Sequence, residues 1–227
     1  STLINDKTVL AIIPARGGSK RLPRKNVLPF AGKPLIVWTI EAGLKSRYID
    51  KVIVTSDDDE IQKISLEAGS KIIKRPHKLA KDNTNLNNVI KHAINIFEEQ
   101  YDIVVVLQPT SPLRKAEDID NALEIMERVK APAVISVCKS NKPLNWHFSV
   151  QVNGTLKPIL QNKIISNSQE NESTYIPNGA LYISKTEYFN STNTFYNDLT
   201  IAYIMTQEKS VDIDSQFDFA IAESLIV

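Results

Sequence analysis

Cysteine is almost absent from this chain of 227 residues, which contains only Cys138. One thiol forms neither an internal disulfide nor a cysteine metal cluster, and its apolar surroundings in AVISVCK predict a buried core position. The three histidines, His77, His92 and His147, show neither metal-ligand spacing nor the pattern of a catalytic triad. The sequence therefore gives no indication of zinc chemistry or of a Ser or Cys nucleophile.

Long apolar runs and an excess of one charge are missing as well. No apolar stretch approaches the roughly 18 residues of a membrane-spanning helix, and no signal-peptide pattern is found, so we expect a cytoplasmic protein without membrane contact. The formal net charge of +1 is unlike the basic excess of a nucleic-acid-binding protein. The 42% hydrophobic and 23% charged fractions are those of ordinary soluble proteins, and the length suits one domain over residues 1–227.

Positive charge is instead concentrated in one loop. Val9–Ile13 is a continuous apolar run, typical of a central parallel strand, and the loop follows from Pro14. Its five cations are Arg16, Lys20, Arg21, Arg24 and Lys25. Open α/β sheets bind ligands at the carboxyl ends of their strands, and the amides of Gly17 and Gly18 can point at an anion. The loop is neither a Walker A motif nor G-x-G-x-x-G. It predicts a phosphate-binding loop of another kind, with a solvated basic turn as the alternative.

Strand and helix patterns alternate along most of the chain. Apolar runs predict further strands at residues 51–55, 71–75, 102–107, 133–138, 178–183 and 210–214. Helical periodicity predicts helices at residues 33–46, 58–68, 87–98, 116–130 and 215–224. The first helix is expected to turn Leu35, Trp38, Ile40 and Leu44 inward. This alternation predicts a Rossmann-like, three-layer α/β/α fold with a mostly parallel central sheet.

Residues 139–176, which we call the excursion, interrupt this alternation. They combine scattered aromatics with many Asn and Gln, and Asn153-Gly154 between short alternating runs is a typical hairpin turn. We expect a small β-rich insertion that lies over the ligand or pairs with a second subunit. The parallel sheet is expected to resume after it, at residues 178–183.

Carboxylates gather at two places. The first is Ser56-Asp57-Asp58-Asp59, directly after a predicted strand. Acidic residues at a helix start cap free amides, so we expect this run to begin the helix at 58–68, with Asp57 also facing the ligand.

The second place is Asp212 and Asp214, which alternate with Val211 and Ile213 on the predicted strand at 210–214. Both carboxylates then lie on one face, where they repel each other and need a cation. Mg²⁺ held by one or two carboxylates and phosphate oxygens is a common arrangement. The alternative is that Asp214 caps the terminal helix and Asp212 is merely exposed. The basic loop favours a metal–triphosphate site.

Five segments together form a specific pattern. They are Ile12-Ile-Pro-Ala-Arg-Gly-Gly-Ser-Lys20 with Pro23-Arg-Lys-Asn26, Arg75-Pro76 with Leu79-Ala80 and Asp82, Gln108-Pro-Thr-Ser-Pro-Leu-Arg114, Asn178-Gly-Ala-Leu-Tyr182, and Asp212-Ile-Asp214. In this combination the chain resembles the CMP-sialic acid synthetases nearly from end to end. The resemblance implies attack by the anomeric 2-hydroxyl of a nonulosonic acid on the α-phosphorus of CTP. With Mg²⁺ as cofactor, this gives the CMP-sugar and pyrophosphate.

The resemblance also implies a role for each matching residue. The nucleotide-binding residues would be Ala15, Arg16, Gly17, Ser19, Lys25, Asn26, Arg75, Asp82 and Thr84. Those at the sugar acid would be Gln108, Tyr182, Phe195 and Tyr196. Asp212 and Asp214 would hold Mg²⁺, and the catalytic set would be Arg16, Lys25 and Asp214. The excursion would join two subunits into a homodimer.

Departures from the family pattern concern the sugar more than the nucleotide. Sialic acid enzymes often carry Lys after a Pro-Leu pair, where this chain has Pro143-Leu144-Asn145. Residues 166–176 lack the usual Arg, and Asn83-Thr84-Asn85 replaces Thr-Ala-Ser. The cations that remain to meet the sugar carboxylate are Lys139, Lys142 and Lys163.

The sugar acid and the activity are therefore left with alternatives. N-acetylneuraminic acid is the default substrate, with legionaminic, pseudaminic and Kdo acids as alternatives. A catalytically silent nucleotide-binding regulator is the non-enzyme alternative, because a fold alone does not secure activity.

Overall fold

The computed structural model describes residues 4, 6–160 and 173–226. Its strands are β1 Val9–Pro14, β2 Pro29–Phe30, β3 Lys33–Pro34, β4 Lys51–Ser56, β5 Lys71–Lys74, β6 Ile103–Val106, β7 Ala133–Lys139, β8 Phe148–Val150, β9 Leu156–Pro158, β10 Tyr175–Lys185 and β11 Ile201–Met205. Its helices are α1 Leu35–Lys45, α2 Asp59–Glu67, α3 Leu86–Ile96, α4 Ala116–Val129, α5 Thr186–Thr192 and α6 Gln216–Ser224, with short 3₁₀ turns η1 Lys25–Val27, η2 His77–Leu79 and η3 Leu144–Trp146.

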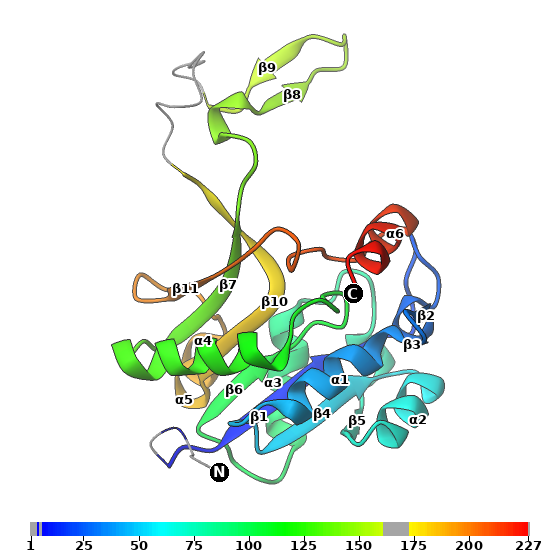
Figure 1. Ribbon diagram of the computed structural model, residues 1–227, viewed down its shortest axis with the longest axis vertical. Helices are drawn as coiled ribbons and strands as arrows, with labels where there is room; N and C mark the ends of the chain where they lie inside the picture. The colour runs from blue at the N-terminus through cyan, green and yellow to red at the C-terminus, as the bar shows by residue number, and fades with distance from the viewer. Residues whose placement is uncertain (1–3, 5, 161–172, 227) are drawn as a thin grey trace.

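A seven-stranded sheet in the order β11-β7-β10-β6-β1-β4-β5 forms the centre of the molecule (Figure 1). Neighbouring strands are parallel from β6 through β1 and β4 to β5, and β11 is parallel to β7. β10 runs antiparallel to both of its neighbours, so the expectation of a parallel strand at residues 178–183 is wrong. An apolar run records that a strand is buried on both faces but not which way it runs.

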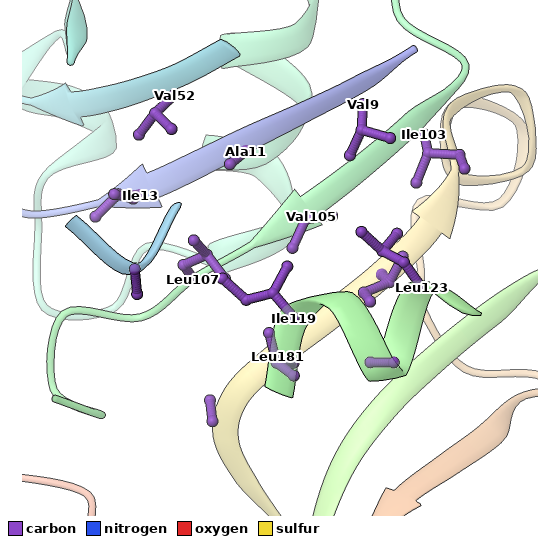
Figure 2. Packing of buried hydrophobic residues seen from close by; sticks show 14 of the residues in the cluster. Val9, Ala11, Ile13, Val52, Ile103, Val105, Leu107, Ile119, Leu123 and Leu181 are labelled. Atoms are coloured by element: carbon purple, nitrogen blue, oxygen red, sulfur yellow. The ribbon is translucent and has the colours of Figure 1, made fainter. Parts of the chain in front are cut away.

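Helices cover both faces of the sheet, which confirms the three-layer α/β/α architecture. α1, α2 and α4 pack on one face through Ile40, Ile61 and Leu123, and α3 and α5 pack on the other through Ile90 and Phe189. Successive residues of β1 serve both layers, because side chains of a strand alternate between the two faces. Figure 2 shows the first layer, where Val9, Ala11 and Ile13 line up with side chains of β4, β6 and α4.

Within α1 the buried face differs from the one expected. Leu35 and Ile40 are buried and Trp38 is half-buried, but Leu44 is 48% exposed. The buried positions also include Ile36, Thr39, Ala42 and Gly43. The sequence LIVWTIEAGLK is apolar on most sides, so periodicity alone does not single out the face that meets the sheet.

The order of the strands opens a crevice at the carboxyl ends of β1 and β6. From β1 the chain proceeds outward on one side to β4 and β5, and then returns to form β6 on the other side of β1. The loops after β1 and β6 therefore leave the sheet in opposite directions, which opens a crevice at their carboxyl ends. Residues 15–26 and 107–115 are these two loops.

The described part of the excursion, residues 139–160 and 173–176, stands away from the rest of the molecule (Figure 1). β7 and β10 lead into it, and β8 pairs with β9 around the turn at Asn153-Gly154, as the sequence predicts. Cys138 lies on this outer part of β7 opposite Ile176 and is half-buried, so the expectation of a buried core thiol is wrong. Lys163 and most of residues 166–176 lie outside the described part of the chain.

Candidate functional site

The loop after β1 is held by two carboxylates that directly follow the neighbouring strand β4. The backbone N–H of Gly17 donates to Oδ1 of Asp57 over 2.9 Å. A side chain at position 17 would meet Asp58, since an added Cβ would lie 2.8 Å from its Oδ2. Glycine is therefore required here for close approach. Asp58 is the N-cap of α2 and accepts from Ile61 N, which confirms capping, while Asp57 faces the basic loop.

Arg16 and Lys20 converge on one carboxylate from a distant loop. The guanidinium of Arg16 pairs with Oδ1 of Asp82, and Lys20 Nζ lies 2.5 Å from Oδ2. Hydrogen bonds from Arg16 and then Lys20 lower the pKa of Asp82. Two cations sharing an exposed carboxylate offer an incoming phosphate two ready partners, because a surface ion pair is weak and exchanges easily.

Arg21 and Lys25 meet a second carboxylate, on the segment before α6. Arg21 Nη1 lies 2.8 Å from Oδ2 of Asp214 and Lys25 Nζ lies 3.7 Å from Oδ1. Lys25 is the more enclosed of the two, with a side chain 19% exposed, and Nζ also approaches the carbonyl of Ile213 at 3.4 Å. The loop cations and the predicted metal ligands thus face one another across the carboxyl end of β1.

The fifth cation of the loop, Arg24, has a different role. Its guanidinium binds both carboxylate oxygens of Asp58, at 2.6 and 3.0 Å, and also contacts Glu60. This bidentate pairing joins the loop to the start of α2 and lowers the pKa of Asp58. Arg24 is therefore engaged in holding the loop in place, whereas the other four cations gather around Asp82 and Asp214.

The segment with Asp212 and Asp214 is extended but is not a strand, so the expected strand at 210–214 is wrong. The Ile213 N–H donates to the carbonyl of Thr110 over 2.8 Å instead of to a sheet neighbour. The expected alternation is present, with Ile213 buried and both carboxylates exposed. Ser215, not Asp214, caps α6, so the capping alternative is wrong for Asp214.

The carboxylates at this segment are of a kind suited to a hard cation. Partial loss of water around Asp212 raises its pKa, and Asp214 and Asp218 raise it further, against opposing contributions from Thr110 and Lys25. Such crowding of negative charge favours a bound cation. No group of three or more His, Cys, Asp or Glu in the described residues is arranged to hold a metal ion. A cation at Asp212 and Asp214 would need ligands from elsewhere, and Mg²⁺ commonly takes phosphate oxygens and water.

On the side of β4 and β5 lies a buried arginine. Arg75 is 7% exposed and donates to the carbonyls of Thr55 at 2.9 Å and Leu79 at 3.3 Å. Burial lowers its pKa to about 10, so it stays protonated at neutral pH. Its Nε has no hydrogen-bond partner among the described residues. An unpaired donor on a buried cation needs a polar partner that the described residues do not supply.

Nearby, Asn26 is buried and donates to the carbonyl of Arg16 over 3.1 Å, and its Oδ1 has no partner among the described residues. Ala15 continues β1 by bonding to Thr55 O over 3.0 Å. The Ser19 hydroxyl donates to Leu22 O over 2.6 Å, which folds the loop back on itself. Thr84 is half-buried and lies two residues beyond Asp82.

The residues expected at a sugar acid lie on the other side of β1. Gln108 follows the end of β6 and packs on Gly179 of β10, where an added Cβ would lie 3.1 Å from its Oε1. Burial raises the pKa of Tyr182, and the charge of Asp212 raises it further. Phe195 is 5% exposed and its ring lies tilted against that of Tyr182, with the ring centroids 5.6 Å apart, so it forms core, whereas Tyr196 is 67% exposed.

Sequence reasoning assigned no role to Thr110 or Asn178. Thr110 ties the Asp212 segment to the β6 loop, and Asn178 receives the Ser136 hydroxyl at 2.6 Å and donates to Ser210 at 3.0 Å. Both residues lie within the segments of the family pattern, which is the signal that marks them. Their roles are long-range contacts, however, and no local pattern encodes such contacts.

Comparison with known proteins identifies the family of this chain. Residues 10–222 match the family described as Cytidylyltransferase. An N-acylneuraminate cytidylyltransferase of Escherichia coli is 38% identical over 94% of this chain and 51% of its own length, so this chain spans about half of that relative. A CMP-N,N'-diacetyllegionaminic acid synthase of Legionella pneumophila is 35% identical over 96% of each chain. A pseudaminic acid cytidylyltransferase of Campylobacter jejuni is 31% identical over 95% of each.

Two solved structures share the fold. A CMP:2-keto-3-deoxy-manno-octonic acid synthetase in complex with CTP superposes with a TM-score of 0.72 at 17% identity, over 96% of this chain and 98% of that one. A 4-diphosphocytidyl-2C-methyl-D-erythritol synthase of Anaerococcus prevotii superposes with a TM-score of 0.69 at 14% identity, over 99% and 98%. The match across nearly the whole length shows that this chain belongs to the cytidylyltransferase family.

Proposed function

We propose that the chain transfers a cytidylyl group from CTP to a nonulosonic acid, giving a CMP-sugar and pyrophosphate. The observation that carries the proposal is the gathering of four loop cations, the Asp212–Asp214 segment and Gln108 around the carboxyl end of β1. The relatives named for acylneuraminate, legionaminic and pseudaminic acids support the class of acceptor. A silent regulator has no need of such a set of opposed charges.

In the reaction, the 2-hydroxyl oxygen of the sugar bonds to the α-phosphorus as the bond to the α–β bridging oxygen breaks. Pyrophosphate leaves with the electron pair, and the hydroxyl proton is released. Chemistry of this kind relies on positioning and on stabilising charge rather than on a covalent nucleophile. Arg16 and Lys25 bind the triphosphate, with Ser19 and neighbouring loop amides beside them. CTP exchanges with Asp82 and Asp214 for these cations.

Asp212 and Asp214 are the residues that would hold Mg²⁺. When bound, the ion would offset charge on the phosphates and so favour the leaving of pyrophosphate. The side chain of Lys25 lies beside this segment and adds a fixed positive charge. On the nucleotide side, Asn26 and Arg75 offer buried polar atoms that have no partner among the described residues, as cytosine or ribose requires.

N-acetylneuraminic acid is the first substrate to test, and legionaminic acid is the second. The Legionella relative favours the second candidate because it matches along 96% of both chains. Asn145 lies in η3 of the excursion, and Lys142 lies 6.0 Å from the Trp146 ring beside it. Of the three lysines proposed to meet the sugar carboxylate, Lys139 and Lys142 lie in the described part of the excursion.

The excursion is the segment that would join two subunits. Its described apolar side chains are largely exposed: Leu144, Trp146, Phe148, Val150, Val152, Leu156, Ile159, Leu160, Tyr175 and Ile176. So many exposed apolar side chains on a projecting element are typical of an interface. A second copy of the chain would cover these side chains and would bring its own excursion to the sugar side of the site.

Pyrophosphate release with CTP tests the proposal, with N-acetylneuraminic, legionaminic, pseudaminic and Kdo acids each supplied in the presence and absence of Mg²⁺. Release with one nonulosonic acid that stops without Mg²⁺ is the expected result. Release with Kdo alone would move the substrate outside the proposed class. CTP binding with no release from any acid would favour the silent regulator.

A further inference from the structure

Arg114 is the largest fully buried side chain in the described part of the protein, with 1% exposed. Its guanidinium donates to three acceptors, which are Ala180 O at 3.1 Å, Gln108 O at 2.9 Å and Thr39 Oγ1 at 3.2 Å. None of the three is a carboxylate. Burial lowers its pKa to about 10, opposed by Asp118, so the buried group is charged at neutral pH. The Asp118 carboxylate stabilises this charge from nearby, but all three hydrogen bonds go to neutral acceptors, so the burial is costly and calls for an explanation.

The three acceptors come from three different elements. Thr39 lies in α1, Gln108 follows β6, and Ala180 lies in β10. β10 bulges between Pro177 and Tyr182, where its pairing with β7 shifts register. The carbonyl of Ala180 belongs to this bulge. Arg114 therefore fastens the bulge of one strand to the turn that follows its neighbour, with α1 as the support.

Gln108 depends on this fastening for its orientation. Its side-chain amide makes no hydrogen bond to any described residue, but it lies against Gly179, whose φ is +77°. Gly179 directly precedes Ala180, whose carbonyl Arg114 holds, and Arg114 also holds the carbonyl of Gln108 itself. One guanidinium thus holds the backbone of Gln108 itself and the backbone next to Gly179, against which the amide lies. A lysine ammonium cannot span these acceptors, because it lacks the planar fork.

We infer that Arg114 is a positioning residue for the sugar acid, acting through Gln108. Arg114 itself is too enclosed to touch a substrate. It holds the Gln108 backbone and the β10 bulge at a fixed separation, so that the free amide of Gln108 points toward the acceptor sugar. The inference rests on the proposed function, in which Gln108 binds the sugar acid.

A double-mutant cycle tests this inference on the full chain. Arg114→Lys is expected to raise the KM for the sugar acid by about 10- to 100-fold, since misplacing a binding group by about 1 Å costs up to that much. The KM for CTP is expected to change by less than about threefold, because the proposed function assigns Gln108 to the sugar acid and not to CTP. In the Gln108→Ala background, Arg114→Lys is expected to add less than about twofold, because its effect requires the amide.

An equal effect of Arg114→Lys in both backgrounds would make Arg114 purely structural and overturn the inference. The inference is also overturned if the KM values for CTP and the sugar acid rise together, or if neither changes. Should Arg114→Lys fail to fold by circular dichroism, Thr39→Val replaces it in the cycle. That variant removes one acceptor of the guanidinium, and a rise of about threefold in the sugar KM, absent in the Gln108→Ala background, is the expected result.

The experiment also separates this inference from the proposals beneath it. If Gln108→Ala leaves the sugar KM unchanged in an enzyme that releases pyrophosphate, the role of Gln108 is wrong and the inference falls with it, while cytidylyl transfer stands. If the unaltered chain releases no pyrophosphate with any sugar acid, the proposed function falls. If only the coupling between positions 108 and 114 is missing, the inference alone falls.

Discussion

The loop at residues 15–26 and the excursion at residues 139–176 both depart from the central sheet, but the chain completes them in opposite ways. The cations of the loop pair with carboxylates from distant parts of the same chain. The described apolar side chains of the excursion are instead left open, as with Val150 at 71% and Leu156 at 63% exposure. The loop cations are therefore held in surface ion pairs, which are weak, whereas the described part of the excursion leaves apolar side chains exposed, as interfaces often do.

Removing a carboxylate that faces the loop is expected to reduce turnover more than any other change proposed here. Asp214→Ala should lower kcat by on the order of 10²–10³-fold, as the loss of a group that stabilises transition-state charge does. Thermal unfolding should be nearly unchanged, because Asp214 is exposed and makes only surface ion pairs. Glu67→Ala, at an exposed carboxylate in the last turn of α2, is the matched control. Normal turnover of Asp214→Ala at saturating Mg²⁺ would remove Asp214 from the metal site.

Two loop cations that share one partner allow a finer comparison. Arg16→Ala should reduce kcat/KM for CTP by about 10- to 100-fold, since hydrogen bonds to charged groups are worth roughly 1.5–3 kcal/mol. Lys20→Ala removes a side chain that is 81% exposed and pairs with the same Asp82. We expect it to change the same parameter by less than about threefold. Steady-state kinetics with varied CTP measures kcat/KM for both variants. An equal loss of kcat/KM in the two would contradict a larger role for Arg16 than for Lys20.

The excursion is tested by making its open surface polar. Val150 and Leu156 face each other in the β8–β9 hairpin. Val150→Asp with Leu156→Asp should weaken self-association by at least about 30-fold, the effect of losing roughly 2 kcal/mol at an interface centre. Sedimentation equilibrium measures it, with the exposed Leu66→Asp on α2 as the control. If the unaltered chain sediments as a monomer at micromolar concentration, the excursion does not serve as a dimer interface.

The smallest expected effect concerns Arg24, the loop cation with a holding role. Arg24→Met should lower the free energy of unfolding by about 0.5–1 kcal/mol, since the pair is partly exposed to water and screened. Arg24 lowers the pKa of Asp58 in the folded state. The pair therefore stabilises the fold fully above the ordinary Asp pKa of about 4 and loses this contribution as pH falls further. Urea unfolding at pH 7 and pH 3.5 should show a difference that shrinks at the lower pH, and a constant difference would argue against the pair.

The architecture was predictable where local sequence determines it. Val9–Ile13 and residues 102–107 are continuous apolar runs, and Asp58 stands where a helix start requires a cap. These features depend on neighbours in sequence. The direction of β10 and the outward position of Leu44 depend on which surface the rest of the chain presents, and neither follows from periodicity.

The candidate site was predictable as a set of residues but not as a set of contacts. The resemblance named Arg16, Lys25 and Asp214, and the fold places these residues at the same end of the sheet. The exchange partner Asp82 and the separate role of Arg24 arise from long-range ion pairs. The segment with Asp214 is fixed by a hydrogen bond from Ile213 to Thr110 rather than by a sheet.

Among the described residues, the helices are too short or too polar for any of them to span a membrane.

The central claim is that the loop and the Asp212–Asp214 segment together present the α-phosphorus of CTP to a sugar hydroxyl. Following an isotopic label from CTP into the products tests this claim most directly. CTP labelled at the α-phosphorus and CTP labelled at the γ-phosphorus are incubated separately with Mg²⁺ and the preferred nonulosonic acid. We expect the α-label in the sugar nucleotide and the γ-label in pyrophosphate, with both transfers slowed in Asp214→Ala by the same factor as kcat. Appearance of the γ-label in inorganic phosphate or on the sugar, with no α-label transferred, would contradict the account.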